Sequence, residues 1–196
     1  MKRSEQTERK ILQAALSLFV RKGYHGTSIQ DISQKVGLTK GALYAHFSGK
    51  GALLMRIIDE FRLLYIDEMI RIVTEFQGNA LEKLNCAMNF SAKFAVKNLD
   101  LCVFLTFLTT ELKTDVDFQP ALKRVYRKYR NFIKGLLSLG MHQRVISKEV
   151  NPDLGALVFM AFHDGILHQW VLNRSSLNGK IFFSTFKAVL MRILKV

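Results

Sequence analysis

The chain has 196 residues, of which 49% are hydrophobic and 23% charged, and its formal net charge is +13. This composition excludes global disorder, and a chain of this length buries about 70% of its unfolded surface without disulfides or metals. The longest apolar run, residues 154–162, is far shorter than the roughly 20 residues that span a bilayer. Cys86 and Cys102 lack zinc-type spacing and predict free thiols in a reducing compartment.

Positive charge is concentrated near the N-terminus. The first 50 residues hold nine Lys or Arg against three Asp or Glu, whereas the remaining 146 hold 20 against 13. This density indicates a polyanionic partner, nucleic acid first and an anionic membrane surface second, with a merely solvated face as the alternative. Glu5 and Glu8 stand where a signal peptide carries positive charge, so we expect an amphipathic helix and a cytoplasmic protein.

The N-terminal segment predicts a first helix over residues 7–22, with Ile11 and Ala15 on its inner face. Gly23 ends this helix. The second helix is expected to begin at Thr27, an N-cap that forms a T-x-x-Q capping box with Gln30.

A tight turn follows at residues 37–39, with Gly37 as the C-cap of the second helix and Thr39 as the N-cap of the third. The third helix is expected over residues 40–47. After a break at residues 48–49, the pattern predicts one long helix from Lys50 to Phe76.

The rest of the chain predicts further helices separated by polar loops. Asn151 and Pro152 mark one start clearly, because Asn is a favoured N-cap and Pro suits the first helical position. The expected fold is therefore all-α, with a helix-turn-helix domain over residues 1–50 and a larger helical ligand-sensing and dimerisation domain over residues 51–196. The later helices are expected at residues 80–98, 100–113, 121–142, 152–173 and 180–194.

Two short helices joined by a glycine-containing turn are the signature of a DNA-binding helix-turn-helix. Such a unit lays its second helix in the major groove, so that helix needs inward anchors and an outer face that allows close approach. Leu43 and Phe47 supply the anchors at a spacing of four residues. Gly41 costs about 1 kcal/mol relative to Ala inside a helix. Close approach to a phosphate or base edge would explain this glycine, and a chance residue in a strained first turn is the alternative.

A resemblance to a known family is carried by the sequence GYxxTSIxxISxxVGLTKGALYAHF at residues 23–47. This segment closely resembles the DNA-binding domain of TetR-type (tetracycline-repressor-like) transcriptional regulators, and the similarity extends over about residues 7–60. The resemblance implies a dimeric bacterial repressor that a small molecule releases from a palindromic operator. Family members commonly carry an acidic residue where this chain has Gly51, which leaves the start of the long helix less firmly defined.

The resemblance also implies a set of contacts to phosphates and base edges, several of them at helix N-termini. Tyr44, His46 and Lys50 are each also compatible with a structural or solvated role. Replacing Lys50 by Ala is expected to lower the salt dependence of DNA binding by about one unit of slope if Lys50 contacts a phosphate. The expected DNA-binding residues are Thr27, Ser28, Thr39, Lys40, Gly41, Tyr44, His46 and Lys50.

Two helices near the C-terminus are too apolar to lie singly on a surface. Together with their copies in a second protomer they predict a four-helix homodimer interface about a two-fold axis. Packing within one protomer is the alternative. The two stripes comprise Leu154, Leu157, Val158, Ala161, Phe162, Gly165 and Ile166, and Ile181, Phe182, Phe186, Val189, Leu190 and Ile193.

Aromatic side chains gather in the predicted sensor domain and suit a flat aromatic or acyl-chain ligand. Ordinary core packing is the alternative for each of them. We expect no cofactor, and no metal because His163 and His168 do not share a helix face. The expected ligand-binding residues are Phe61, Tyr65, Phe90, Phe94, Phe104, Phe107, His163 and Trp170.

A basic run interleaved with tyrosines lies at residues 123–134. It is either a solvated helix face or a site for an anionic ligand, such as an acyl thioester of a nucleotide cofactor.

The sequence thus predicts a bacterial, ligand-responsive DNA-binding regulator, with double-stranded operator DNA, a second copy of the chain and a small hydrophobic or aromatic ligand as partners. An enzyme is not expected, because no P-loop, H-E-x-x-H, G-x-S-x-G or G-x-G-x-x-G motif occurs. The remaining alternative is a regulator whose C-terminal half binds a protein.

Overall fold

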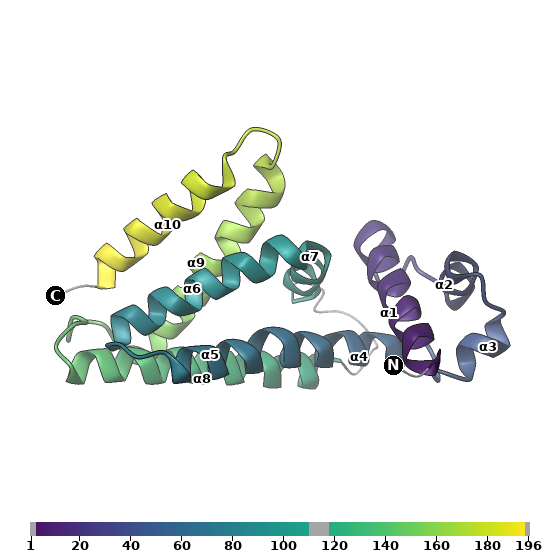
Figure 1. The fold of residues 1–196 in the computed structure, drawn as a ribbon, viewed down its shortest axis with the longest axis horizontal. Coiled ribbons are helices and arrows are strands. Elements are labelled where there is room, and N and C mark those ends of the chain that lie inside the picture. The colour runs from purple at the N-terminus through teal and green to yellow at the C-terminus, as the bar shows by residue number, and fades with distance from the viewer. Residues whose placement is uncertain (1–2, 110–117, 195–196) are drawn as a thin grey trace. The chain divides into compact units, whose positions relative to one another are not determined.

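The computed structural model describes residues 3–109 and 118–194, apart from the side chains of Arg3 and Phe107, and every regular element in these ranges is helical (Figure 1). The all-α prediction is confirmed. In chain order the elements are α1 (Arg3–Lys22), α2 (Ile29–Val36), α3 (Lys40–Tyr44), α4 (Lys50–Phe61), the π-helical segment η1 (Arg62–Asp67), α5 (Glu68–Glu75), α6 (Ala80–Lys97), α7 (Leu99–Leu108), α8 (Gln119–His142), α9 (Pro152–Asn173) and α10 (Gly179–Leu194).

The chain divides into two compact units. The first comprises Met1–Arg62 and Leu99–Leu122, and the second Leu63–Asn98 and Lys123–Val196. The first unit therefore contains α4 and α7 in addition to the expected helix-turn-helix. The functional boundary at residue 50 stays a prediction, since packing alone does not define where DNA recognition ends.

The core of the first unit is built on the apolar face of α1. Ile11 and Ala15 are fully buried, as their helical spacing predicted, and α1 packs against α2, α4 and α7. The ring of Phe19 stacks on that of Phe104 from α7, with centroids 5.4 Å apart. Fully burying side chains of this size contributes about 2 kcal/mol each, so α1 is the main packing surface of this unit.

The turn between α2 and α3 depends on a left-handed glycine. Gly37 has φ 70° and ψ 32°, and its N–H together with that of Leu38 donates to the last carbonyls of α2. Both hydrogen bonds are typical of a Schellman motif, which satisfies carbonyl groups that the helix end leaves free. The predicted C-cap at Gly37 and N-cap at Thr39 are confirmed.

The single long helix expected from Lys50 to Phe76 is wrong in one respect. Its α-helical hydrogen bonding stops at Phe61, resumes at Glu68, and is π-helical between Arg62 and Asp67. One row of buried residues recurs every four positions along this segment, at Leu53, Ile57, Phe61, Tyr65, Met69 and Val73. An α-helix repeats about every 3.6 residues, so a strict spacing of four drifts around it, and a wider π turn corrects the drift.

The second unit contains α5 beside α6, and α10 against α6 and α9. Asn151 caps α9 ahead of Pro152, as predicted. Asn79 and Glu82 form a further capping box at the start of α6, which was not predicted from the sequence. Helix α7 ends at Leu108, whereas the expected helix extended to residue 113; residues 110–117 lie outside the described part. Figure 1 shows α9 and α10 as a hairpin.

We predict that Gly37→Ala lowers the free energy of unfolding by about 1 kcal/mol, because a Cβ makes the left-handed conformation unfavourable. Space is not the cause, since no atom lies within 4 Å of the added Cβ. Gly135→Ala is the matched control: it lies within α8 with equal space and an ordinary φ, and should raise stability by roughly 0.5–1 kcal/mol. Urea unfolding followed by circular dichroism measures both, and a neutral Gly37→Ala would contradict the assignment.

Candidate functional site

Helix α3 presents a polar face on a firmly anchored base. Its N-cap Thr39 accepts a hydrogen bond from the N–H of Ala42 at 3.1 Å. Leu43 and Phe47 are buried, which confirms the two inward anchors, although α3 itself ends at Tyr44. Because its start is capped and its inner face is packed, the outer face is held in one orientation.

The outer face of α3 consists of exposed residues. Lys40 and Gly41 are exposed, and Tyr44 is 52% exposed, so the alternative of a partly buried core tyrosine is not supported. A Cβ added to Gly41 would meet only the hydroxyl of Thr39, at 4.0 Å. Packing within the protein therefore does not require this glycine.

The start of α2 differs from the expected capping. The N-cap is Ser28, not Thr27, and it forms its capping box with Asp31 rather than Gln30. The carboxylate of Asp31 accepts from the N–H of Ser28 at 2.8 Å and forms an ion pair with Lys22. A carboxylate is favoured over an amide here by the helix dipole, and Lys22 and Ser28 hold the pKa of Asp31 well below its usual range.

Thr27 instead has an internal role. Its side chain is 1% exposed, and its hydroxyl donates to the carbonyl of Gly23 at 2.9 Å. The structure does not present this side chain to a phosphate, in contrast to the expectation. Ser28 and Gln30 are exposed, so the mistaken capping assignment also concealed Gln30 as a polar residue available on α2.

Lys50 was expected at a phosphate, but its ammonium group is turned into the protein. Its Nζ donates to the carbonyl oxygens of Tyr24 at 2.8 Å and Thr27 at 2.9 Å. The same nitrogen lies 4.4 Å from the centroid of the Tyr24 ring, a cation–π distance. Burial lowers the pKa of Lys50. The side chain thus fastens the connector between α1 and α2 to the start of α4.

His46 is neither fully exposed, like Tyr44, nor turned into the protein, like Lys50. It is half-buried, and its Nδ1 is 3.6 Å from a carboxylate oxygen of Glu8, which makes an ion pair when the imidazole is protonated. Of the expected DNA contacts, the structure therefore leaves Ser28, Thr39, Lys40, Gly41 and Tyr44 exposed.

The expected ligand-binding residues do not form one group. Phe61 and Phe104 belong to the first unit, where Phe104 stacks on Phe19, and the side chain of Phe107 lies outside the described part. Trp170 packs at the hairpin, where a Cβ on Gly179 would come within 2.6 Å of its ring. Burial of Phe104 favours the core-packing alternative for that residue, whereas Trp170 is half-buried.

Four of the expected residues do come together, in the second unit. The ring of Tyr65 lies 6.0 Å from Phe90 and 5.0 Å from Phe94, and it stacks on His163 at 6.0 Å. The Tyr65 hydroxyl is hydrogen-bonded to Ser91 at 2.7 Å and to Nε2 of His163 at 3.2 Å. These side chains, with Ser91 and Tyr129, are called the tyrosine cluster below.

Sequence reasoning missed Ser91 and Tyr129. Tyr129 is 4% exposed, and its ring lies 6.0 Å from that of Tyr65. Tyr129 was overlooked because it stands within the basic run. It is nevertheless spaced four residues from the apolar Val125 and four from Ile133. That spacing places it on the inner face of α8 and was the available signal.

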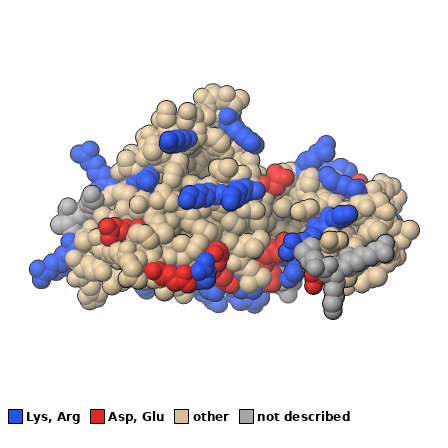
Figure 2. All heavy atoms as spheres, in the orientation of Figure 1, with Lys and Arg blue, Asp and Glu red and all other residues tan. Residues whose placement is uncertain are grey.

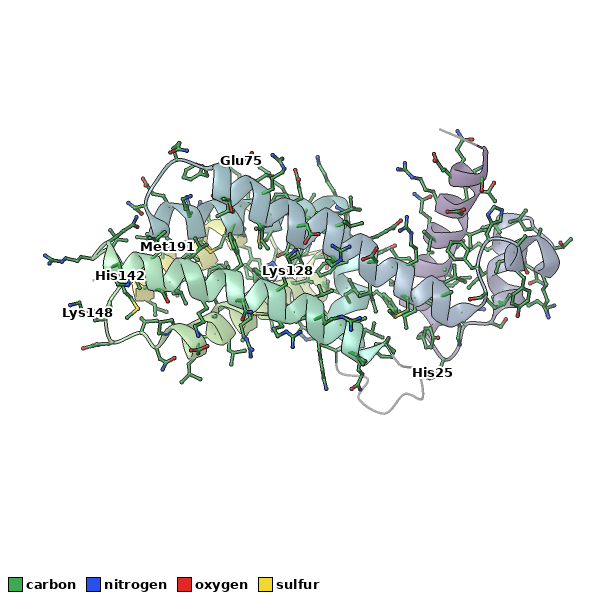
Figure 3. The ribbon with its side chains drawn as sticks, turned by 90° about the horizontal axis from the view of Figure 1, so that it is seen from below. His25, Glu75, Lys128, His142, Lys148 and Met191 are labelled. Atoms are coloured by element: carbon green, nitrogen blue, oxygen red, sulfur yellow. The ribbon has the colours of Figure 1, made fainter. Side chains whose placement is uncertain are left out.

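The basic run lies on the outer face of α8. Lys128 pairs with Asp67 and Lys134 with Asp153, at 2.7 and 2.8 Å. Figure 3 is viewed onto this helix, with Lys128 near its middle. Lys123, Arg124 and Arg127 are exposed, and none has an ion-pair partner within the described residues.

Other chemistries find little support in the described part of the chain. No group of three or more His, Cys, Asp or Glu there could hold a metal ion. No helix in the same ranges is long and apolar enough to cross a membrane. Burial raises the pKa of the Cys102 thiol to about 12, which disfavours the reactive thiolate.

Comparison with known proteins identifies the exposed α2–α3 unit. Residues 11–57 match the family model described as bacterial regulatory proteins, tetR family. The "Fatty acid metabolism regulator protein" of Bacillus subtilis (strain 168) is 22% identical over 173 residues, which cover 88% of each chain.

Two solved structures share the fold. The MbdR regulator from Azoarcus sp. CIB aligns with a TM-score of 0.85 and 26% identity, covering 97% of this chain and 100% of that chain. FadR from Bacillus subtilis in complex with stearoyl-CoA aligns with a TM-score of 0.81 and 18% identity, covering 95% and 98%. The DNA-binding segment therefore belongs to the tetR family of bacterial regulatory proteins, and the described fold is shared with solved regulators of this type.

Proposed function

We propose that this protein is a homodimeric repressor that reads a palindromic operator through α3 and is released from it by a small hydrophobic ligand bound in the second unit. The observation that carries the proposal is the exposed trio Lys40, Gly41 and Tyr44 on a capped and anchored helix. Gly41 supports it further, because a glycine that no packing contact requires permits close approach of the backbone to DNA.

The α9–α10 hairpin supports dimerisation. Many of its exposed side chains are large and apolar, and Figure 2 shows mainly uncharged side chains with a few Lys and Arg over the hairpin, at the top of the view. On α9 the exposed apolar residues recur at helical spacing, which makes a continuous stripe suited to a second copy. The large exposed side chains of the hairpin are Leu154, Leu157, Val158, Phe162, Leu172, Ile181, Val189 and Ile193.

The ligand class is an acyl thioester of a nucleotide cofactor. The tyrosine cluster contributes the apolar rings of Phe90 and Phe94. The outer face of α8 contributes Lys123, Arg124 and Arg127, which have no ion-pair partner among the described residues. One ligand with an acyl chain and an anionic nucleotide matches both features. The FadR relative bound to stearoyl-CoA supports this class.

Release from the operator requires the ligand to bind two states of the dimer unequally. The coupling free energy equals the difference between its affinities for the DNA-binding state and for the alternative state. The alternative state would place the two recognition helices at a spacing that the operator half-sites do not match.

The test is fluorescence anisotropy with DNA from the upstream intergenic region, at two salt concentrations and with scrambled competitor DNA. Binding that survives competition, and that an acyl-coenzyme A series reverses, supports the proposal. If affinity for the upstream DNA and for the scrambled DNA fell equally as salt rises, the binding would be driven by charge alone and the proposal would be overturned.

We predict that Lys50→Ala lowers the free energy of unfolding by about 2 kcal/mol, because two hydrogen bonds from a charged group are lost. The slope of log affinity against log salt should stay unchanged, since this ammonium group is turned toward carbonyl groups. Lys40→Ala is the matched control: its exposed side chain should leave stability unchanged and reduce the slope by about 0.9. A slope reduced equally by Lys50→Ala would restore the phosphate contact expected from the family resemblance.

We predict that Val158→Arg converts the dimer into a monomer, because it buries an unpaired charge in the apolar stripe. Val96→Arg is the control, since Val96 is 75% exposed on α6, outside the hairpin, and should leave the dimer intact. Sedimentation velocity reports both. A dimeric Val158→Arg protein would remove α9 from the interface.

A further inference from the structure

Hydrogen bonds in the tyrosine cluster have a defined direction. Ser91 has one hydroxyl proton and donates it to the carbonyl oxygen of Ala87 at 2.9 Å. The Tyr65 hydroxyl therefore donates to Ser91, and Nε2 of His163 donates to the Tyr65 oxygen. In this series of hydrogen bonds, from His163 through Tyr65 to Ser91, each proton is therefore already donated to an acceptor.

The hydroxyl of Tyr129 is the exception. It is buried and has no hydrogen-bond partner within the described residues. The hydroxyls of Tyr65 and Ser91 are close enough to influence the pKa of Tyr129, but their geometry does not make a hydrogen bond with it. Burial raises its pKa, so the group stays a neutral O–H donor at physiological pH.

An unused buried hydroxyl is costly. It loses its hydrogen bonds to water on folding and gains none in return, whereas phenylalanine would fill the same space without that cost. The neighbouring hydroxyls and His163 already donate their protons to one another or to a carbonyl group, so the Tyr129 hydroxyl lacks an acceptor. A ligand carbonyl oxygen supplies one, whereas a hydrocarbon does not.

Two further features lie in the same unit as this donor. The rings of Phe90 and Phe94 lie 6.0 and 5.0 Å from Tyr65 and suit an apolar chain. Lys128, next to Tyr129 in the sequence of α8, and Arg127 are exposed cations on the outer face of that helix. An apolar chain, one carbonyl and an anionic group are the parts of an acyl-coenzyme A.

We propose that the Tyr129 hydroxyl donates a hydrogen bond to the thioester carbonyl oxygen of a bound acyl-coenzyme A, while the Tyr65–Ser91–His163 chain keeps the adjacent donors engaged. This inference rests on the proposed ligand class and goes beyond it. It assigns the residue that distinguishes a thioester from an otherwise identical ligand without a carbonyl.

The experiment compares octanoyl-coenzyme A with its thioether analogue S-octyl-coenzyme A, which differs by the carbonyl oxygen. Calorimetric titration of the full-length protein should show a three- to tenfold preference for the thioester, the value of one neutral hydrogen bond. Tyr129→Phe should abolish this preference by weakening only the thioester. Tyr126→Phe, the same change three residues earlier on α8, should preserve it.

Thermal unfolding without ligand provides a second readout. Tyr129→Phe should leave the Tm unchanged or raise it, because an unused hydroxyl is removed. Tyr65→Phe should lower the Tm, because His163 and Ser91 lose their shared partner. A lower Tm for Tyr129→Phe would mean that its hydroxyl is satisfied in the free protein, and would overturn the inference.

The ligand outcomes separate this inference from the proposed function. Equal affinity of the wild type for the two compounds would overturn the role of Tyr129 while leaving operator binding and release intact. Failure of acyl-coenzyme A compounds from isovaleryl to stearoyl to bind at all would overturn both this inference and the ligand class. Operator binding, measured separately by anisotropy, would stand or fall on its own.

Discussion

The candidate DNA interface depends on the ammonium group of Lys50. In the connector between α1 and α2, the carbonyl groups of Tyr24 and Thr27 lie outside any helix. The ammonium group of Lys50 donates a hydrogen bond to each of them. Ser28 follows directly and begins α2, so the position of that N-terminus is tied to the first residue of α4. A lysine suits the task because three donors on a flexible stem can reach two carbonyls and a ring face at once.

Around this contact, each helix end of the recognition unit is capped by a nearby residue. A carboxylate closes the start of α2, a left-handed glycine its end, and a threonine hydroxyl the start of α3. Because these are side-chain and backbone hydrogen bonds within a few residues, the exposed face of α3 is oriented before any DNA arrives. Preorganisation of this kind lowers the entropic cost of binding.

Sequence patterns predicted the helices well, because caps and apolar spacing are local properties. Gly37, Thr39 and Asn151 were placed correctly for that reason. The internal hydrogen bonds of Lys50 could not be foreseen, because their two carbonyl acceptors lie more than 20 residues away in sequence and no local pattern reveals such a contact. Thr27 and Ser28 were exchanged because both are good caps, and the choice was decided by Asp31 and its ion pair with Lys22.

The π turn at residues 62–67 gives the helix between Lys50 and Glu75 a place where its winding can change. Rewinding it as an α-helix would displace the side chains that follow by one position, a rotation of about 100°. Tyr65 would then leave Ser91, and Asp67 would leave Lys128. The Tyr65–Ser91 hydrogen bond and the Asp67–Lys128 ion pair therefore stabilise the π-helical winding of this segment, and both would have to break before it could rewind.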